Sequence, residues 1–237
     1  LFRVEAMAPE KTTCFRLGIV YCKEGQTTEQ EMFQNSHTSE GFKNFLDIIG
    51  DEIELQGWGG YRGQLSVRSQ ATSYYTTFEG LEIMYHVCTL LNGEQQRRLV
   101  GNDTVVLYYH DSQDGKSSFA SNCSRSAMSQ VFAVIQPRDE GTKFKMAVQS
   151  RKRVKAFGPR MPPNPSFKVE TEEQKSTFKT FLLTKLINGY RAAVESPPLD
   201  KMLKRPRRVV INQVIQRYPW NGKKKYIVRG RKTSFYK

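Results

Sequence analysis

Residues 104–109 read TVVLYY, an unbroken run of β-branched, leucine and aromatic residues. A strand with one solvent-facing side alternates apolar and polar residues, whereas a strand covered on both faces is apolar throughout. The run therefore predicts a strand inside a sheet, with other elements packed against both of its faces. It follows Gly101-Asn102-Asp103 directly, and these residue types favour a turn.

The sequence around this run predicts a mixture of strands and helices. Residues 14–22, CFRLGIVYC, predict a strand, and residues 74–78 and 81–89 predict two strands paired across the turn Glu79-Gly80. Other expected elements are a short helix after a capping box at Thr28, helices at 42–49, 94–99 and 172–194, strands at 52–56, 127–136 and 142–149, and a proline-rich loop at 157–165. This mixture places the chain in the α/β or α+β class.

The net charge of +14 comes from the C-terminal end of the chain. Residues 201–237 hold 13 basic residues and no acidic ones, which leaves 24 Lys+Arg and 23 Asp+Glu, a net of +1, in residues 1–200. A basic tail of this kind binds anionic surfaces, whether membrane or nucleic acid, with an affinity that falls as salt rises. The tail, and not the folded part, therefore carries the charge.

Composition and spacing exclude several classes of protein. No apolar run reaches the roughly 18 residues that span a membrane, and the hydrophobic content of 38% is ordinary for a globular chain. The cysteines and histidines show neither zinc-ligand nor disulfide spacing, which favours reduced thiols in an intracellular protein and no metal site. They are Cys14, Cys22, Cys88, Cys123, His37, His86 and His110.

No motif of a free-standing enzyme is present. Residues 57–63, GWGGYRG, are one residue too long for the dinucleotide fingerprint and favour turns, and the chain has no P-loop and no nucleophile elbow. His86 is expected on a strand face between Met84 and Cys88, where a hydrogen-bonded structural histidine is the favoured interpretation. Residues 97–103, RRLVGND, predict a short helix with two arginines that runs into a turn.

Six blocks, two of them within stretches already quoted, stand in order along the chain: LGIVY at 17–21, GQTTEQEMFQN at 25–35, EIMYHV at 82–87, VGND at 100–103, FGP at 157–159 and FLLTKLIN at 181–188. Each block is short, but their order and spacing together are specific. They resemble the catalytic domain of Rap GTPase-activating proteins over about Phe15 to Ala193.

This resemblance implies an α/β fold with a central mixed sheet flanked by helices, and a GTPase activator that acts in trans. In this family an asparagine thumb enters the nucleotide site of the GTPase, and the matching residue is Asn102. Rap-type GTPases lack the glutamine that orients the attacking water in Ras, so a carboxamide supplied in trans can replace it. Arg97 and Arg98 match basic positions suited to GTPase contact. Asp103 is grouped with them among the GTPase-binding residues, and it is expected to fix the end of the helix.

The resemblance also implies the domain organisation. Residues 1–13 are expected to be the remnant of a preceding region of a longer protein, residues 14–200 the catalytic domain, and residues 201–237 a basic helix or tail. No cofactor of the domain's own is implied, because GTP and Mg²⁺ belong to the partner GTPase. The expected location is the cytoplasm, with recruitment to membranes through residues 201–237.

Two departures from the family pattern leave alternatives open. Leu99 stands where members usually carry histidine, and the connection at residues 88–93 is short. One alternative is a catalytically weak or inactive GTPase-binding module of the same fold. Another is a membrane- or nucleic-acid-binding protein that acts through its tail. The expected partner is a Rap-type GTPase, ahead of Rheb or Ral types, and nucleic acid is not expected.

Overall fold

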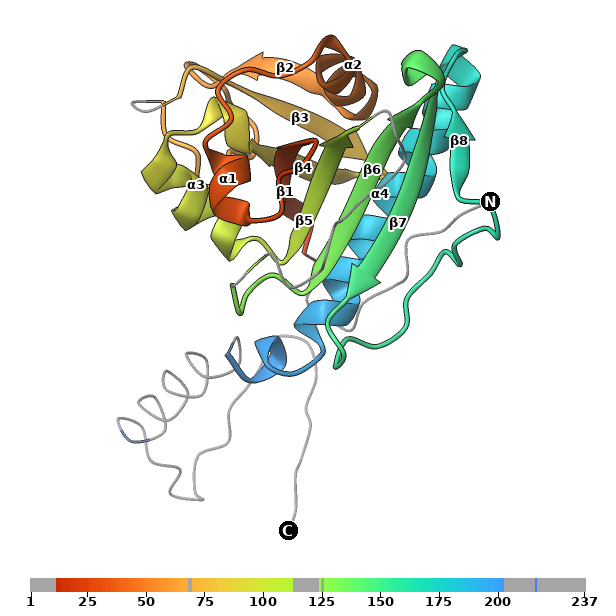
Figure 1. Ribbon diagram of the computed structural model, residues 1–237. Helices are drawn as coiled ribbons and strands as arrows, with labels where there is room; N and C mark the ends of the chain where they lie inside the picture. Colours follow the sequence, from red (N-terminus) through yellow and green to blue (C-terminus); the bar gives the residue numbers. More distant parts are fainter. Residues whose placement is uncertain (1–11, 68–69, 113–123, 125, 203–215, 217–237) are drawn as a thin grey trace. The chain divides into compact units, whose positions relative to one another are not determined.

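An eight-stranded sheet forms the centre of the computed structural model, which describes residues 12–67, 70–112, 124, 126–202 and 216 (Figure 1). The strand order is β2-β3-β4-β1-β5-β6-β7-β8. The strands are β1 (Cys14–Lys23), β2 (Asp51–Glu54), β3 (Thr72–Phe78), β4 (Leu81–Val87), β5 (Val105–Asp111), β6 (Val131–Arg138), β7 (Lys143–Ser150) and β8 (Ser166–Lys168).

The sheet has a parallel centre and antiparallel edges. Strands β4, β1, β5 and β6 pair in parallel, while β2-β3-β4 and β6-β7-β8 pair antiparallel on the two sides. The central strand β5 is buried from Val105 to His110, as its unbroken apolar run predicts. The expected central mixed sheet flanked by helices is therefore confirmed.

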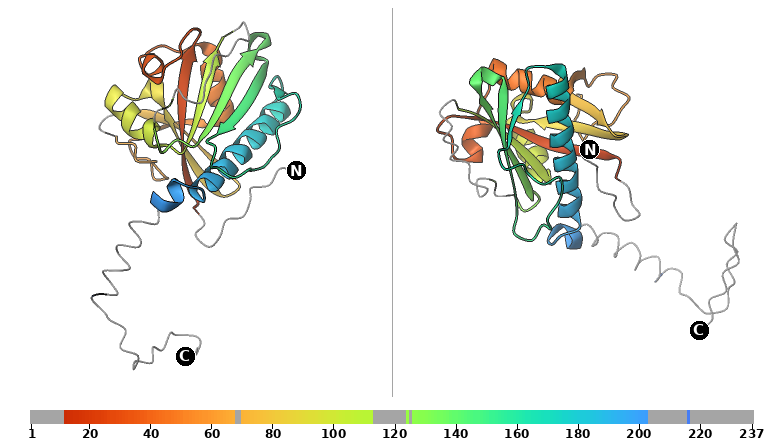
Figure 2. Two further views of the ribbon diagram at one scale, coloured as in Figure 1. Left: turned by 60° about the horizontal axis from the view of Figure 1, so that its bottom comes forward. Right: turned by 90° about the vertical axis from the view of Figure 1, so that its right-hand side faces the viewer.

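Each face of the sheet carries its own apolar layer and its own helices. Helices α2 (Glu40–Ile49) and α4 (Glu172–Val194) cover one face, and Figure 2 shows α4 crossing the sheet there. Helices α1 (Glu29–Phe33) and α3 (Gly93–Leu99) contribute Met32 and Leu99 to the layer on the other face. Strand β5 lies between these two layers, which explains why it lacks polar alternation.

Helix α2 shows how local signals and packing agree. The Ser39 side chain accepts a hydrogen bond from the backbone N–H of Phe42 at the helix start, and Gly50 ends the helix. A Cβ at Gly50 would lie 2.9 Å from Cε2 of Tyr85, so glycine lets the chain pass close to β4. The apolar stripe of the helix is buried in the first layer; it comprises Phe42, Phe45, Leu46 and Ile49.

The Phe-Gly-Pro block at 157–159 packs on helix α4. Lys185 Nζ donates to the Phe157 carbonyl at 2.8 Å and lies 4.2 Å from the centre of the Phe157 ring. Asn188 Nδ2 donates to the Gly158 carbonyl at 3.3 Å. A Cβ at Gly189 would lie 3.0 Å from the Phe157 ring, so glycine permits this contact. The loop is thus an ordered crossing, as its prolines predict.

Some element boundaries differ from the sequence prediction. Strand β6 begins at Val131 and not at 127, β4 ends at Val87 and is followed by the 3₁₀ turn η1 (Cys88–Leu90), and β8 was not predicted. A second 3₁₀ turn, η2 (Val100–Asn102), continues α3 beyond Leu99, where the predicted helix ends. The residues just before β6 bond to a segment that is distant in sequence: the Gln130 N–H donates to the Thr104 carbonyl.

The chain divides into two compact units, Leu1–Asp200 and Lys201–Lys237. Of the second unit the structure describes only Lys201, Met202 and Gln216, so the predictions for the basic tail, and for residues 1–11, lie outside the described residues. Within the described ranges, no helix is long and apolar enough to cross a bilayer. Cys22 and Cys88 are buried, Cys14 is half-buried, and burial raises the pKa of the Cys88 thiol to about 12.

Candidate functional site

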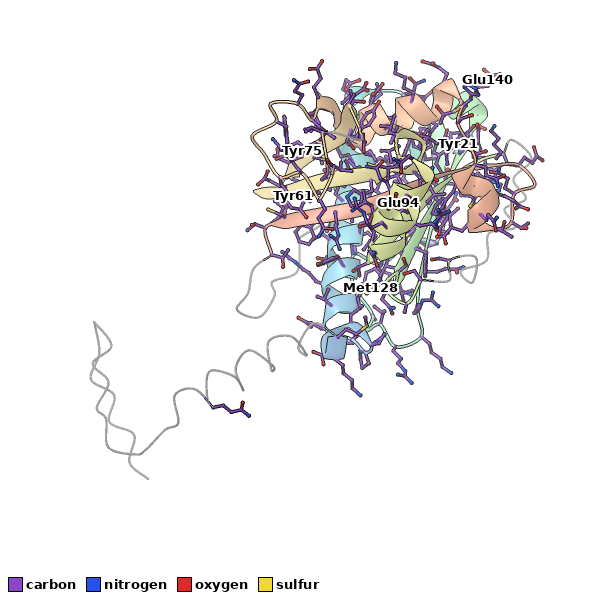
Figure 3. All side chains as sticks on the ribbon, turned by 90° about the vertical axis from the view of Figure 1, so that its left-hand side faces the viewer. Tyr21, Tyr61, Tyr75, Glu94, Met128 and Glu140 are labelled. Carbon is purple, nitrogen blue, oxygen red and sulfur yellow. The ribbon has the colours of Figure 1, made fainter. Side chains whose placement is uncertain are left out.

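Helix α3 and the turn η2 form one continuous element on the surface of the molecule. Asn92 starts it with a capping box: its Oδ1 accepts from the backbone N–H of Gln95 at 3.0 Å, and Gln95 Oε1 accepts from Asn92 N–H at 3.2 Å. Leu99 and Val100 are buried in the apolar layer beneath. Figure 3 looks onto this side of the molecule, where Glu94 marks α3.

The solvent-facing side of this element presents three of the predicted site residues together. Arg97 and Arg98 occupy the last turn of α3, and Asn102 is the last residue of η2; all three are exposed. The arginines also complement the negative C-terminal end of the helix dipole, which gives them a structural role of their own. The arrangement offers a partner one exposed carboxamide and two exposed positive charges on the same element.

The carboxamide of Asn102 is held in a defined orientation. Its Nδ2 donates to the carbonyl oxygen of Arg98 at 2.6 Å. Because a carbonyl oxygen only accepts, the amide nitrogen must face the end of the helix, and the amide oxygen is turned away from it. Asn102 therefore presents a hydrogen-bond acceptor on the exposed side of the turn.

Asp103, the next residue, is separated from the exposed group. Its side chain has no exposed surface, and its Oδ2 lies 2.8 Å from Nδ1 of His86 on β4. Arg16 on β1 forms an ion pair with it, with Nε 3.3 Å from Oδ1, without hydrogen-bond geometry. Burial raises the pKa of the Asp103 carboxyl, and the charges of His86 and Arg16 offset part of that rise.

His86 connects Asp103 to a second loop. Its Nε2 lies 2.7 Å from the carbonyl oxygen of Gly63, so Nε2 carries a proton and donates it to that carbonyl. Its other nitrogen faces Asp103, and the histidine side chain is fully buried. The interpretation of His86 as a hydrogen-bonded structural histidine is thus confirmed.

These contacts change what is expected of Asp103. The sequence-based prediction placed Asp103 among the GTPase-binding residues, but its carboxylate is enclosed by His86 and Arg16 and presents no surface to a partner. Its backbone N–H donates to the Val100 carbonyl at 3.1 Å and closes the η2 turn, in keeping with a residue that fixes the helix end. A role in contacting the GTPase stays a prediction for Arg97, Arg98 and Asn102.

A second set of contacts holds the turn from the side. Ser126 Oγ donates to the Gly101 carbonyl, and Ser129 Oγ donates to the Asp103 carbonyl at 2.9 Å. The guanidinium of Arg151 in turn donates to the carbonyls of Ser126 and Ser129 at 3.0 and 2.9 Å. The segment before β6 that contains Ser126 and Ser129 thus supports the turn as a brace, and Arg151 holds this brace in place.

The sequence did not single out Arg16, Gly63 or the two brace serines. Their partners come from strands and loops that only the folded sheet brings together, so spacing along the chain carries no signal for them. One signal was available: Arg16 and His86 are polar residues that stand between apolar neighbours on their strands. Such residues are normally retained when buried because they have partners.

Comparison with known proteins identifies the family. The Rap/Ran-GAP family model matches residues 32–208. The chain is 36% identical over 217 residues to the GTPase-activating Rap/Ran-GAP domain-like protein 3 of Danio rerio, covering 87% of this chain and 21% of that protein. It is 35% identical over 214 residues to the signal-induced proliferation-associated 1-like protein 3 of Mus musculus, covering 85% and 12%.

A solved structure agrees with the fold. The structure of the TSC2 GAP domain superposes with a TM-score of 0.55 at 24% identity, covering 74% of this chain and 96% of that chain. The chain therefore belongs to the Rap/Ran-GAP family, whose domains act in trans on small GTPases. It spans about a fifth of the length of the domain-like protein 3 relatives and less of the others.

Proposed function

We propose that this domain stimulates GTP hydrolysis by a Rap-type small GTPase, with Asn102 inserted into the nucleotide site of the partner. The observation that carries the proposal is the exposed carboxamide of Asn102, held on a braced turn beside two exposed arginines in a member of the Rap/Ran-GAP family. GTP and Mg²⁺ belong to the partner in this scheme, and the domain itself forms no covalent bond.

The chemistry asked of Asn102 is positioning. Phosphoryl transfer from GTP to water needs the water held in line with the γ-phosphate, and a carboxamide can both accept from and donate to that water. Because Nδ2 is bonded to the Arg98 carbonyl, the amide oxygen is turned away from the helix end and is available to accept a hydrogen bond from the water. Held in place before the reaction, this group contributes orientation without reorganisation at the transition state.

Reversing the two arginine charges tests the proposed contact surface. The double variant Arg97→Glu/Arg98→Glu is expected to lower the association rate constant with the GTPase by roughly 10-fold or more, because opposite charge steers encounter. The rate at saturating domain should change little. Stopped-flow association at several salt concentrations measures this, and the effect should shrink as salt rises.

A matched control carries the same charge change elsewhere. Lys43 on α2 and Lys168 on β8 are both exposed, and α2 lies on the face of the sheet opposite α3. Lys43→Glu/Lys168→Glu should leave association nearly unchanged. Equal slowing by both double variants would show a general charge effect and remove the arginines from the contact surface.

A transition-state mimic separates an activator from a module that only binds. A catalyst binds the transition state more tightly than the ground state, so the domain should prefer a partner loaded with GDP and aluminium fluoride over one loaded with a non-hydrolysable GTP analogue. Leu99, buried at 2% exposure in the apolar layer, does not occupy the exposed surface beside Asn102. Equal affinity for both loaded forms would favour the inactive module.

A further inference from the structure

We propose that His86 and Arg16 are positioning residues for Asn102 and act on it through Asp103. The inference rests on the proposed function, since it assigns a role in the same reaction. None of the His86 or Asp103 side chain is exposed, so neither can touch GTP. Their contribution to the rate must pass through the turn that carries Asn102.

The connection from the sheet to Asn102 is short. Asp103 follows Asn102 directly, and consecutive Cα atoms are about 3.8 Å apart. Its carboxylate is held by His86 on β4 at 2.8 Å and by Arg16 on β1 at 3.3 Å, and both strands lie in the parallel centre of the sheet. Fixing the Asp103 side chain therefore fixes the end of η2 against the parallel centre of the sheet.

Two glycines let this connection form. A Cβ at Gly18 would lie 3.1 Å from Asp103 Oδ2 and 3.1 Å from Val100 Cγ1, so the turn rests directly on the backbone of β1. Gly63 has a φ of +58°, a conformation that favours glycine, and its carbonyl receives the His86 hydrogen bond. The arrangement joins β1, β4, η2 and the loop before β3.

Stability alone gives little reason to bury the His86–Asp103 pair. Replacing a buried ion pair with apolar groups of similar volume is often neutral or stabilising, because desolvation offsets the attraction. What the pair supplies is direction: His86 is bonded at both ring nitrogens, so the ring cannot rotate without losing a bond. An apolar contact would leave the turn free to shift.

The test measures turnover and binding separately on GTP-loaded Rap-type GTPase. His86→Phe should lower the single-turnover rate at saturating domain by roughly 10²-fold, the cost expected for misplacing a positioned group by about 1 Å. The dissociation constant for the loaded GTPase should stay the same, because the contact surface is untouched. Arg16→Met should lower the rate in the same direction.

Tyr85→Phe is the matched control. Tyr85 neighbours His86 on β4 but faces the other layer, where its hydroxyl donates to the Ile49 carbonyl at 3.0 Å. This variant also loses a buried hydrogen bond but has no connection to η2, so its rate should equal that of the unaltered chain. A comparable loss of rate in Tyr85→Phe would show that damage to β4 in general explains the His86 result.

A double-mutant cycle gives the decisive reading. If His86 acts only through Asn102, His86→Phe should have no further effect in the Asn102→Ala background. Equal losses in both backgrounds overturn the inference. No stimulation by the unaltered chain overturns the proposed function instead, so the two failures are distinct.

A conservative variant keeps the test open if His86→Phe does not fold. Asparagine at position 103 can donate from its amide to Nδ1 of neutral His86 and present its oxygen to Arg16. Asp103→Asn should therefore retain far more of the rate than Asp103→Ala, at equal affinity for the GTPase. Equal losses in these two variants also overturn the inference.

Discussion

Replacing Asn102 with alanine is expected to lower the stimulated rate of GTP hydrolysis by roughly 10²–10⁴-fold, the range for losing one group that positions the transition state. The side chain is exposed, and its hydrogen bond is to a carbonyl within the same element. Truncation should therefore leave the fold intact and the affinity for the GTP-loaded partner nearly unchanged. Single-turnover hydrolysis at saturating domain, paired with a binding titration, measures both quantities.

Asn102→Asp is the isosteric companion of this variant. It keeps the size of the side chain but puts a carboxylate oxygen against the Arg98 carbonyl, where two acceptors repel. Its negative charge would also face the phosphates of GTP. The loss of rate should be at least as large as for alanine.

If affinity collapsed along with the rate in Asn102→Ala, the residue would be structural and the thumb assignment wrong.

Replacing Phe45 with alanine is expected to lower the free energy of unfolding by about 3–5 kcal/mol, the usual cost of removing a buried aromatic ring. Phe45 has no exposed surface, and its ring centre lies 5.3 Å from that of Tyr109, 5.4 Å from Phe144 and 6.4 Å from Phe178. The ring joins α2, β5, β7 and α4, so the cavity would open where four elements meet.

Urea unfolding followed by circular dichroism measures this loss. Leu90→Ala is the control, because Leu90 is 36% exposed. Its truncation should lower the free energy of unfolding by much less than Phe45→Ala does. An equal change in both variants would show that the layer between α2, α4 and the sheet is not the main source of stability.

The sequence predicted the elements whose signals are local. Helix α4 runs from Glu172 to Val194 as expected, because Thr171 and Gln174 form its capping box and the prolines at 197–198 follow its end. The turn at Glu79-Gly80 joins β3 and β4 as predicted. In these cases the pattern of neighbouring residues suffices to define the structure.

What the sequence did not predict depends on contacts between distant segments. The start of β6 moves to Val131 because residues before it bond to Asp103 and Thr104. The candidate site also has a part that the sequence predicted and a part that it did not. Asn102 and the two arginines were found through a resemblance carried by short blocks. The support beneath them needs the register that brings β1 and β4 side by side, in which Gly18 pairs with His86.

The most direct measurement of the central claim is single-turnover hydrolysis of GTP-loaded Rap with and without this chain, with Rheb, Ral and Ras loaded in parallel. The account predicts strong stimulation of Rap, weaker or no stimulation of the other three, and loss of the effect in Asn102→Ala. A folded chain that stimulates none of the four GTPases would contradict the account.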